Sequence, residues 1–178
     1  MRKLVVTEFV TLDGIMEAPE QWAFEFHTDE TAKFKLDEML HADALVLGKN
    51  TYNIFASSWP SMSGELADQL NGIRKHVIST TATELAWHNS QAITGDPVAV
   101  VSSLKNQLGT DILVAGSASV VQALTEHRLV DEYRLLVCPL VLGSGQRLFT
   151  TSCAPAHLTL GEMKTFDSGA LLLRYEAA

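Results

Sequence analysis

The fold is decided by the stretch Asp131-Glu132-Tyr133-Arg134-Leu135-Leu136-Val137-Cys138-Pro139-Leu140-Val141-Leu142-Gly143-Ser144-Gly145-Gln146-Arg147-Leu148-Phe149. An apolar strand runs into a proline, then a glycine-rich turn, then a basic and aromatic exit. The stretch follows closely on Gly116-Ser117-Ala118-Ser119-Val120-Val121, a turn of small residues that opens a helix. A strand, a turn without bulky side chains and a helix N-terminus form a place where backbone N–H groups can meet a phosphate. The pattern therefore indicates a nucleotide cofactor site.

Working outward, β-branched and apolar runs alternate with segments of helical periodicity. The runs predict strands over Leu4–Val10, Ala44–Gly48, Lys75–Ser79, Ile112–Ala115 and Tyr133–Leu140, then a terminal hairpin from Leu158–Phe166 and Ala170–Glu176. Helices are expected from Thr28 or Asp29, from Asn50, after the cap Asp96-Pro97, and over Ser117–His127. The β-branched run after Pro97 leaves a strand open there. Residues 11–27 and 57–63 are expected to be loops.

This order predicts one domain, residues 1–178, of the α/β class. Alternating strands and helices favour a mainly parallel sheet, and the consecutive strands at the end favour an antiparallel edge hairpin. Ligands of such sheets bind at the carboxyl ends of the strands.

Composition excludes several functions. The chain has 178 residues, 47% of them hydrophobic and 19% charged, which is typical of a globular domain rather than a disordered one. The formal charge of −8 opposes nucleic-acid binding, and no apolar run reaches the ~20 residues of a membrane span. The two cysteines, Cys138 and Cys153, show neither metal-ligand spacing nor a disulfide framework, so we expect no metal and a cytoplasmic location.

Three turns at predicted strand ends are candidates for holding phosphates. The first is Gly48-Lys49-Asn50-Thr51, where a cation and a hydroxyl stand at a helix start. The second is Ser79-Thr80-Thr81, whose hydroxyls could meet a ribose or a phosphate or could form a local turn. The third is Gly116-Ser117-Ala118-Ser119, in which either serine could instead cap the helix.

Two further features come from side chains near the ends of the fold. Asp13, at the end of the first strand, could orient a substrate or assist proton transfer, or could close a turn with its own backbone. Leu158-Thr159-Leu160 and Leu171-Leu172-Leu173 place apolar residues in an edge hairpin, which predicts a homodimer.

Taken together, these segments resemble the dihydrofolate-reductase-like family, and most closely the RibD C-terminal (riboflavin-biosynthesis reductase) domain and its stand-alone relatives. The segments that carry the resemblance are Thr11-Leu12-Asp13-Gly14, Gly48-Lys49-Asn50-Thr51-Tyr52, His76-Val77-Ile78-Ser79-Thr80-Thr81, Asp111-Ile112-Leu113-Val114-Ala115-Gly116-Ser117-Ala118 and Asp131 to Phe149. The resemblance implies a three-layer dihydrofolate-reductase-like fold and an enzyme, an NADPH-dependent oxidoreductase that transfers a hydride to a small heterocyclic or conjugated substrate.

The resemblance also implies a cofactor site, residue by residue. Lys49, Asn50 and Thr51, after Gly48, would meet the cofactor phosphates. Ser79, Thr80 and Thr81 would lie near the adenosine 2′-phosphate. The pyrophosphate would be cradled by Gly116, Ser117, Ala118, Ser119 and Val120, and Asp13 would stand beside the nicotinamide and substrate.

The chain also departs from the family pattern. Many relatives carry arginine where this chain has Lys49, and lysine is a point charge rather than a bidentate fork, so NADH is possible beside NADPH. A general acid has no secure counterpart. The alternatives are a non-catalytic nucleotide- or metabolite-binding module and a lone pyrimidine reductase of riboflavin biosynthesis.

Overall fold

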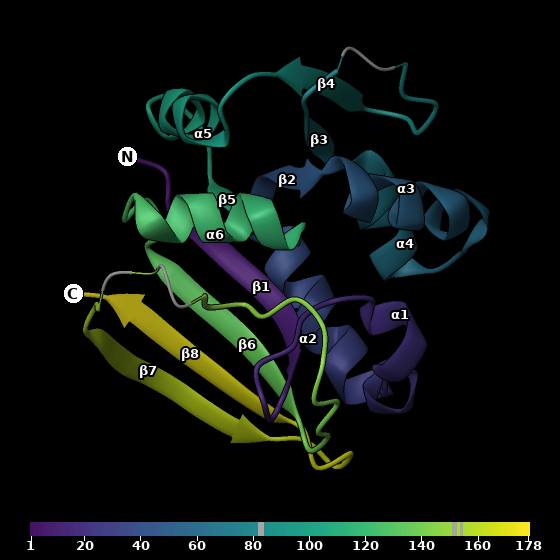
Figure 1. Cartoon of the computed structure of the whole chain (residues 1–178). Helices are drawn as coiled ribbons and strands as arrows, with labels where there is room; N and C mark the ends of the chain where they lie inside the picture. Colours follow the sequence, from purple (N-terminus) through teal and green to yellow (C-terminus); the bar gives the residue numbers. More distant parts are fainter. Residues whose placement is uncertain (82–83, 151–152, 154) are drawn as a thin grey trace.

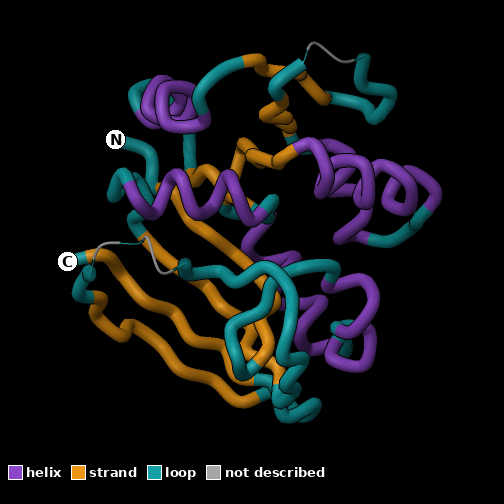
Figure 2. The backbone as a smooth tube through the Cα atoms, viewed as in Figure 1, coloured by secondary structure: helices purple, strands orange, loops and turns teal. Residues whose placement is uncertain are grey.

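The computed structural model describes residues 1–81, 84–150, 153 and 155–178, and its strands form a single sheet (Figures 1 and 2). The strands are β1 (Leu4–Thr11), β2 (Ala42–Gly48), β3 (Arg74–Ser79), β4 (Ser90–Thr94), β5 (Asp111–Val114), β6 (Glu132–Cys138), β7 (Leu158–Thr165) and β8 (Leu171–Ala177). Their order across the sheet is β4-β3-β2-β5-β1-β6-β8-β7. Strands β1 to β6 pair in parallel, whereas β8 pairs antiparallel with both β6 and β7. The predicted parallel sheet with an antiparallel terminal hairpin is confirmed.

Helices cover both faces of the sheet and make three layers (Figure 1). They are α1 (Pro19–Trp22), α2 (Asp29–Leu40), α3 (Lys49–Ser58), α4 (Glu65–Gly72), α5 (Pro97–Lys105) and α6 (Ala118–Glu126), with 3₁₀ turns η1 (Phe24–Phe26) and η2 (Trp59–Ser61). Helices α5 and α6 share one apolar core with β1, β2 and β5. A second core, on the opposite face, joins α2, α3 and α4 to the same strands.

The central strands are apolar throughout because both of their faces are covered. Leu4 and Val6 of β1 pack in the core beneath α5 and α6, while Val5 packs in the core on the opposite face, and all three are fully buried. The same burial holds for the Leu45–Leu47 run of β2 and for Ile112–Val114 of β5. Continuous apolar runs are the expected sequence of parallel strands buried on both sides.

One buried carboxylate ties the antiparallel hairpin to the parallel part of the sheet. Glu132 at the start of β6 is fully buried and accepts hydrogen bonds from Lys3 Nζ at 2.6 Å, Arg134 Nε at 2.6 Å and Arg174 Nε at 2.5 Å. Burial alone would raise the pKa of Glu132, but hydrogen bonds from Arg174, Lys3 and Arg134 outweigh it and hold the pKa at about 2.

The boundaries correct several expectations. Residues 11–27 contain α1 and η1, and residues 57–63 contain the end of α3 and η2, so neither segment is only loop. Helix α4 and strand β4 were not expected. The Asp96 side chain accepts from the Val98 N–H at 3.1 Å, which caps α5 and excludes the alternative strand.

Helix α2 begins as expected, and its buried face combines polar and apolar residues. Thr28 caps it, with the Thr31 N–H donating to the Thr28 hydroxyl at 3.3 Å. Its buried residues are Thr31, Glu38 and Met39, whereas Leu40 is half exposed. The Thr7 hydroxyl of β1 donates to Glu38 at 2.8 Å, while Met39 packs in the apolar core, so α2 makes both polar and apolar contacts with the sheet.

Candidate functional site

Two of the predicted phosphate turns meet at the carboxyl end of the sheet. Strands β2 and β5 are neighbours, so the Gly48 turn after β2 lies against the Gly116 turn after β5. The Gly48 N–H donates to the Gly116 carbonyl oxygen at 3.0 Å, and the Thr51 and Ser117 hydroxyl oxygens lie 3.2 Å apart. We call this group of four residues, Gly48, Thr51, Gly116 and Ser117, the cradle. It joins residues that are 66 positions apart in the sequence.

The cradle has no room for side chains at its two glycines. A Cβ at Gly48 would lie 2.8 Å from the Ser117 Cβ and 2.9 Å from the Ser117 nitrogen. A Cβ at Gly116 would lie 2.6 Å from the Thr51 hydroxyl oxygen, and Gly116 also has a φ of +78°, which disfavours other residues. Both glycines are therefore required for the two turns to touch.

Both helices that begin at the cradle lack a side-chain cap. Helix α3 follows Gly48 and helix α6 follows Ser117, and no side chain accepts from the first-turn N–H groups of either. The sequence left open whether Ser117 or Ser119 caps α6; the Ser117 hydroxyl instead faces Thr51. Uncapped N–H groups at a helix N-terminus carry partial positive charge and are suited to an anion.

Lys49 adds a full positive charge beside the cradle, at the carboxyl end of β2. It is the first residue of α3, and its Nζ lies 5.1 Å from the centre of the Tyr52 ring, a cation–π contact within one helical turn. Asn50, the next residue, is exposed at the same helix start.

The Ser79 turn lies one strand further along the sheet, since β3 is the neighbour of β2. Ser79 is buried, and its hydroxyl accepts from the Thr81 N–H at 3.3 Å, which is the local turn that the sequence left open. Thr80 and Thr81 are exposed beside it. The three predicted turns thus all lie at the carboxyl ends of the parallel strands, but the Ser79 turn does not contribute to the cradle contacts.

The other predicted residues of the α6 turn differ in accessibility. Ala118 and Val120 are buried in the core beneath α6, and the Val120 N–H already donates to the Ser117 carbonyl at 3.0 Å. Ser119 is exposed at the helix start. Among these residues, Ser119 presents a polar side chain to solvent.

Asp13 is held by the glycine-rich loop that follows β6. Its carboxylate accepts from the Thr11 hydroxyl at 2.5 Å, from the Gly143 N–H at 2.8 Å and from the Leu142 N–H at 3.3 Å. The Thr11 hydroxyl first, and then these backbone N–H groups, lower the pKa of Asp13 to about 2. The N–H groups of this glycine-rich turn therefore meet an anion supplied by the chain itself.

One acidic residue of this region was overlooked at the sequence level. Glu8, in the middle of β1, is buried, and its Oε1 has no hydrogen-bond partner among the described residues. Burial raises the pKa of Glu8 to about 8, although Lys35 and the Gly116 backbone N–H lower it in part. The signal was present in the sequence, because Glu8 interrupts an otherwise apolar strand next to the cradle.

No group of three or more His, Cys, Asp or Glu side chains among the described residues is arranged to hold a metal ion. None of the described helices has the length and apolar character that a membrane crossing requires.

The sheet and the cradle define the class of this protein as a dihydrofolate-reductase-like α/β fold. Dihydrofolate reductase from Enterococcus faecalis, solved in complex with NADP(H), superposes with a TM-score of 0.67 at 12% identity, over 98% of this chain and 96% of that one. A pyrimidine reductase-like protein from Corynebacterium diphtheriae superposes with a TM-score of 0.75 at 12% identity, over 99% of this chain and 92% of that one.

The particular family follows from the sequence comparison. The RibD C-terminal domain model matches residues 2–172, and the chain belongs to this family of reductase domains. The uncharacterized protein YyaP of Bacillus subtilis (strain 168) is 28% identical over 98% of this chain and 94% of its own length. The expected resemblance and fold are confirmed.

Proposed function

We propose that this protein is an NADPH-dependent reductase that transfers a hydride to a small heterocyclic or conjugated substrate. The observation that carries the proposal is the cradle, where two uncapped helix N-termini and two obligatory glycines meet at the carboxyl ends of adjacent parallel strands. This is where ligands of open α/β sheets bind, and two helix N-termini without side-chain caps suit a pyrophosphate. Membership of a reductase family supports the same assignment.

The residues present fit the phosphates of a dinucleotide. Gly48 and Gly116 let the two helix starts lie close together, and Ser117 with Thr51 offers hydroxyl donors. Lys49 supplies the positive charge, and Ser79, Thr80 and Thr81 are the neutral donors proposed for the 2′-phosphate. NADPH, when bound, supplies the hydride, and the protein supplies binding and orientation.

The roles of the two acids differ in this proposal. Asp13, with a pKa of about 2, is ionised at neutral pH and holds the loop after β6 against the loop after β1, so it positions these loops rather than donating a proton. Glu8, with a pKa of about 8, is largely protonated at neutral pH.

The cofactor is tested by fluorescence titration of NADPH and NADH. A partly exposed charged hydrogen bond contributes roughly 1.5–3 kcal/mol, so Lys49 should favour NADPH over NADH by about one to two decades. Lys49→Ala should remove most of this preference and leave NADH binding nearly unchanged. Lys33→Ala, which removes an exposed lysine from α2, is the matched control. Equal weakening of both cofactors by Lys49→Ala would move Lys49 from the 2′-phosphate to the pyrophosphate, and no binding of either cofactor at millimolar concentration would refute the proposal.

A non-catalytic binding module on the same fold is the second candidate. The observation that favours it is the engagement of the Asp13 carboxylate by Leu142 and Gly143, which removes the predicted acid from proton transfer. Steady oxidation of NADPH with any pterin, pyrimidine or quinone-like acceptor rules this candidate out. A pyrimidine acceptor alone would identify a lone pyrimidine reductase.

A further inference from the structure

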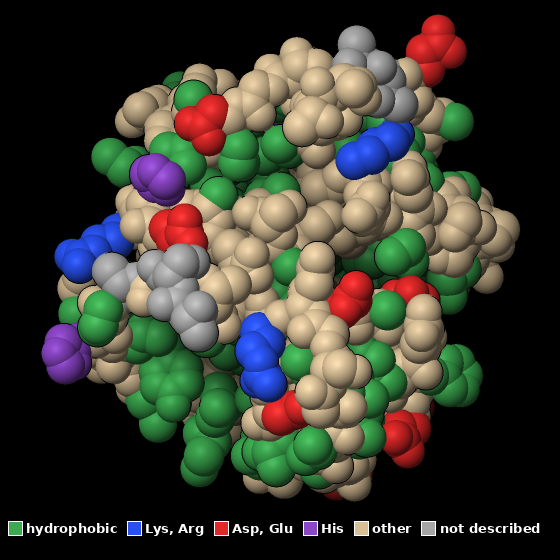
Figure 3. All heavy atoms as spheres, viewed as in Figure 1, with side chains coloured by type: hydrophobic (Ala, Val, Ile, Leu, Met, Phe, Trp, Pro, Cys, Tyr) green, Lys and Arg blue, Asp and Glu red, His purple; other side chains and the backbone are tan. Residues whose placement is uncertain are grey.

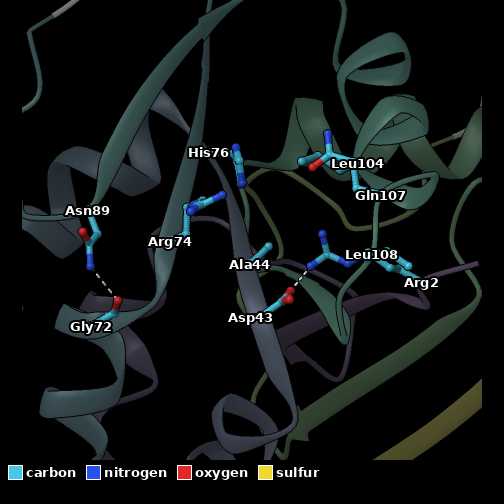
Figure 4. A pocket seen from close by; sticks show the side chains of 10 residues that line it. All are labelled: Arg2, Asp43, Ala44, Gly72, Arg74, His76, Asn89, Leu104, Gln107 and Leu108. Carbon is cyan, nitrogen blue, oxygen red and sulfur yellow. Dashed lines mark hydrogen bonds and ion pairs between the residues drawn. The ribbon is translucent and has the colours of Figure 1, made fainter.

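A pocket lies at the opposite end of the sheet from the cradle. It has a volume of about 330 Å³ and is lined by Arg2, Asp43, Ala44, Gly72, Arg74, His76, Asn89, Leu104, Gln107 and Leu108 (Figure 4). Asp43 and Arg74 stand at the amino ends of β2 and β3, whereas the cradle lies at the carboxyl end of β2. The pocket is therefore separate from the proposed cofactor site.

Basic side chains from two segments converge on this pocket. Arg74 and His76 project from β3, and Arg2 reaches in from the segment before β1 (Figure 4). Arg2 is buried and already paired: its guanidinium donates to the Asp43 carboxylate and to the Thr110 carbonyl. Arg74 forms no ion pair or hydrogen bond with the described residues, so one full positive charge remains uncompensated.

His76 points to a missing partner. It is 6% exposed, and its Nδ1 is buried without a hydrogen-bond partner among the described residues. A buried polar atom without a partner is costly and rare in native proteins, unless a ligand or water completes it. Burial, and then the charges of Arg74 and Arg2, lower the pKa of His76, so the imidazole is neutral at pH 7 and one of its ring nitrogens carries a proton to donate.

Negative groups around the pocket oppose this charge. The Asp43 carboxylate is paired with Arg2. Burial lowers the pKa of Arg2 and Asp111 partly raises it, and the Asp111 carboxylate lies 3.8 Å from the Arg134 guanidinium. Helix α5 ends at the pocket, and a helix C-terminus carries roughly half a negative charge. The unpaired guanidinium of Arg74 carries a full positive charge, and the α5 side of the lining, Leu104, Gln107 and Leu108, adds no acid. The pocket is thus net positive in a chain whose formal charge is −8.

We propose that this pocket binds a small phosphate-type oxyanion, with Arg74 and His76 as donors and the buried Arg2 behind them. A guanidinium matches a tetrahedral oxyanion by paired N–H donors, and burial of Arg2 and His76 fixes their positions. The volume accommodates a phosphate group, free or carried by a small metabolite.

Calorimetric titration of inorganic phosphate at pH 7 tests the proposal with two variants that each remove one positive charge. Arg74→Ala should weaken phosphate binding roughly ten- to a hundredfold, because it removes a charged hydrogen-bond donor. Arg74 is exposed and unpaired in the fold, so the variant should fold normally. Lys33→Ala removes an exposed charge on α2 instead and should leave this binding unchanged. Glycerol 3-phosphate is titrated separately: equal affinity identifies the free ion, and tighter binding identifies a phosphorylated metabolite.

The His76 ring signals give an independent reading by NMR. Sulfate keeps its charge between pH 5.5 and pH 8, so it replaces phosphate in this titration. The charged and titratable groups around His76 are Arg74 on β3, Arg2 before β1 and Asp43 on β2. A bound dianion should raise the pKa of His76 in the wild type and not in Arg74→Ala. Phosphate binding that survives Arg74→Ala, or that disappears in Lys49→Ala, would overturn the proposal and assign the anion to the cradle.

Discussion

Gly48→Ala tests the cradle most directly, because the structure gives the size of the collision. The new Cβ would meet the Ser117 Cβ at 2.8 Å and the Ser117 nitrogen at 2.9 Å, and neither atom can move away by a side-chain rotation. The two turns must therefore separate by about half an ångström to reach an ordinary contact near 3.4 Å. Overpacking of this kind costs about 1–3 kcal/mol. In a domain of this size, a cost of about 2 kcal/mol lowers the melting temperature by roughly 4–8 °C.

The same separation should impair cofactor binding. It moves the start of α6 away from the start of α3, so the two sets of N–H groups no longer address one pyrophosphate. The loss of one charged hydrogen bond corresponds to roughly ten- to a hundredfold weaker binding of NADPH.

Thermal unfolding by circular dichroism and fluorescence titration of NADPH measure the two effects. Gly72→Ala is the matched control, since Gly72 ends α4 and a Cβ there meets nothing within 4 Å. The control should be neutral or slightly stabilising, because alanine is the better helix former. If Gly48→Ala has the same melting temperature as Gly72→Ala and binds NADPH like the wild type, the cradle is not closely packed and the reasoning fails.

Three further predictions concern the buried carboxylates and the edge hairpin. Glu8 has a raised pKa, so the folded protein binds more protons than the unfolded chain between about pH 4.5 and 8, and stability falls with rising pH across that window. Glu8→Gln should flatten this slope, which is at most about 1.4 kcal/mol per pH unit, in urea unfolding at several pH values; an unchanged slope would contradict the burial argument. Glu132 has a lowered pKa, so its contribution is present above about pH 4.5 and is lost as pH falls toward 2. Glu132→Gln should cost about 3–5 kcal/mol at pH 7 by leaving buried cations uncompensated, and a loss below about 1 kcal/mol would show that the network is dispensable. We also propose a homodimer that covers the hydrophobic side chains seen over β7 and β8 in Figure 3, where Leu160 and Met163 are 50% and 64% exposed. Light scattering at micromolar concentration should give twice the mass of 19.4 kDa, with a shift toward monomer for Met163→Glu, and a monomeric wild type excludes the dimer.

The parts of the fold that could be predicted are those in which burial shapes the sequence locally. Strands β1, β2 and β5 are apolar throughout because both of their faces are covered. The start of α5 is predictable because Asp96 is a good N-cap and Pro97 favours the first helical position. The antiparallel hairpin follows from two apolar runs around Gly169.

The elements that were missed have weak local signals. Helix α4 buries only Ala67 and Leu70, a stripe too short to stand out in its polar sequence. Strand β4 has no buried residue and exists through its pairing with β3 at the edge of the sheet. The buried face of α2 combines Thr31 and Glu38 with Met39, so the apolar residues of α2 indicate this face only in part.

In the candidate site, too, the local turns could be predicted from the sequence, but the contacts between them could not. Each turn of the cradle was recognisable as a strand end followed by a helix start. The contact between Thr51 and Ser117 depends on β2 and β5 being neighbours, which no local pattern states. The cluster of Arg2, Arg74 and His76 is likewise assembled only by the sheet order, and no local pattern of the sequence indicates it.

The two carboxylates that hold the glycine-rich loop have a consequence for local opening of the fold. Asp13 accepts from Leu142 and Gly143, and Glu17 accepts from the Gln146 N–H at 2.9 Å. The loop after β1 and the loop after β6, more than a hundred residues apart in sequence, are thereby linked at several points. In native-state hydrogen exchange they should form one cooperative unit, whose amides share a single opening free energy below that of global unfolding. Backbone hydrogen bonds join the same two loops, from the Leu12 N–H to the Leu140 carbonyl at 2.9 Å and from the Leu148 N–H to the Gly14 carbonyl at 3.0 Å, so the two loops should open and close as one body.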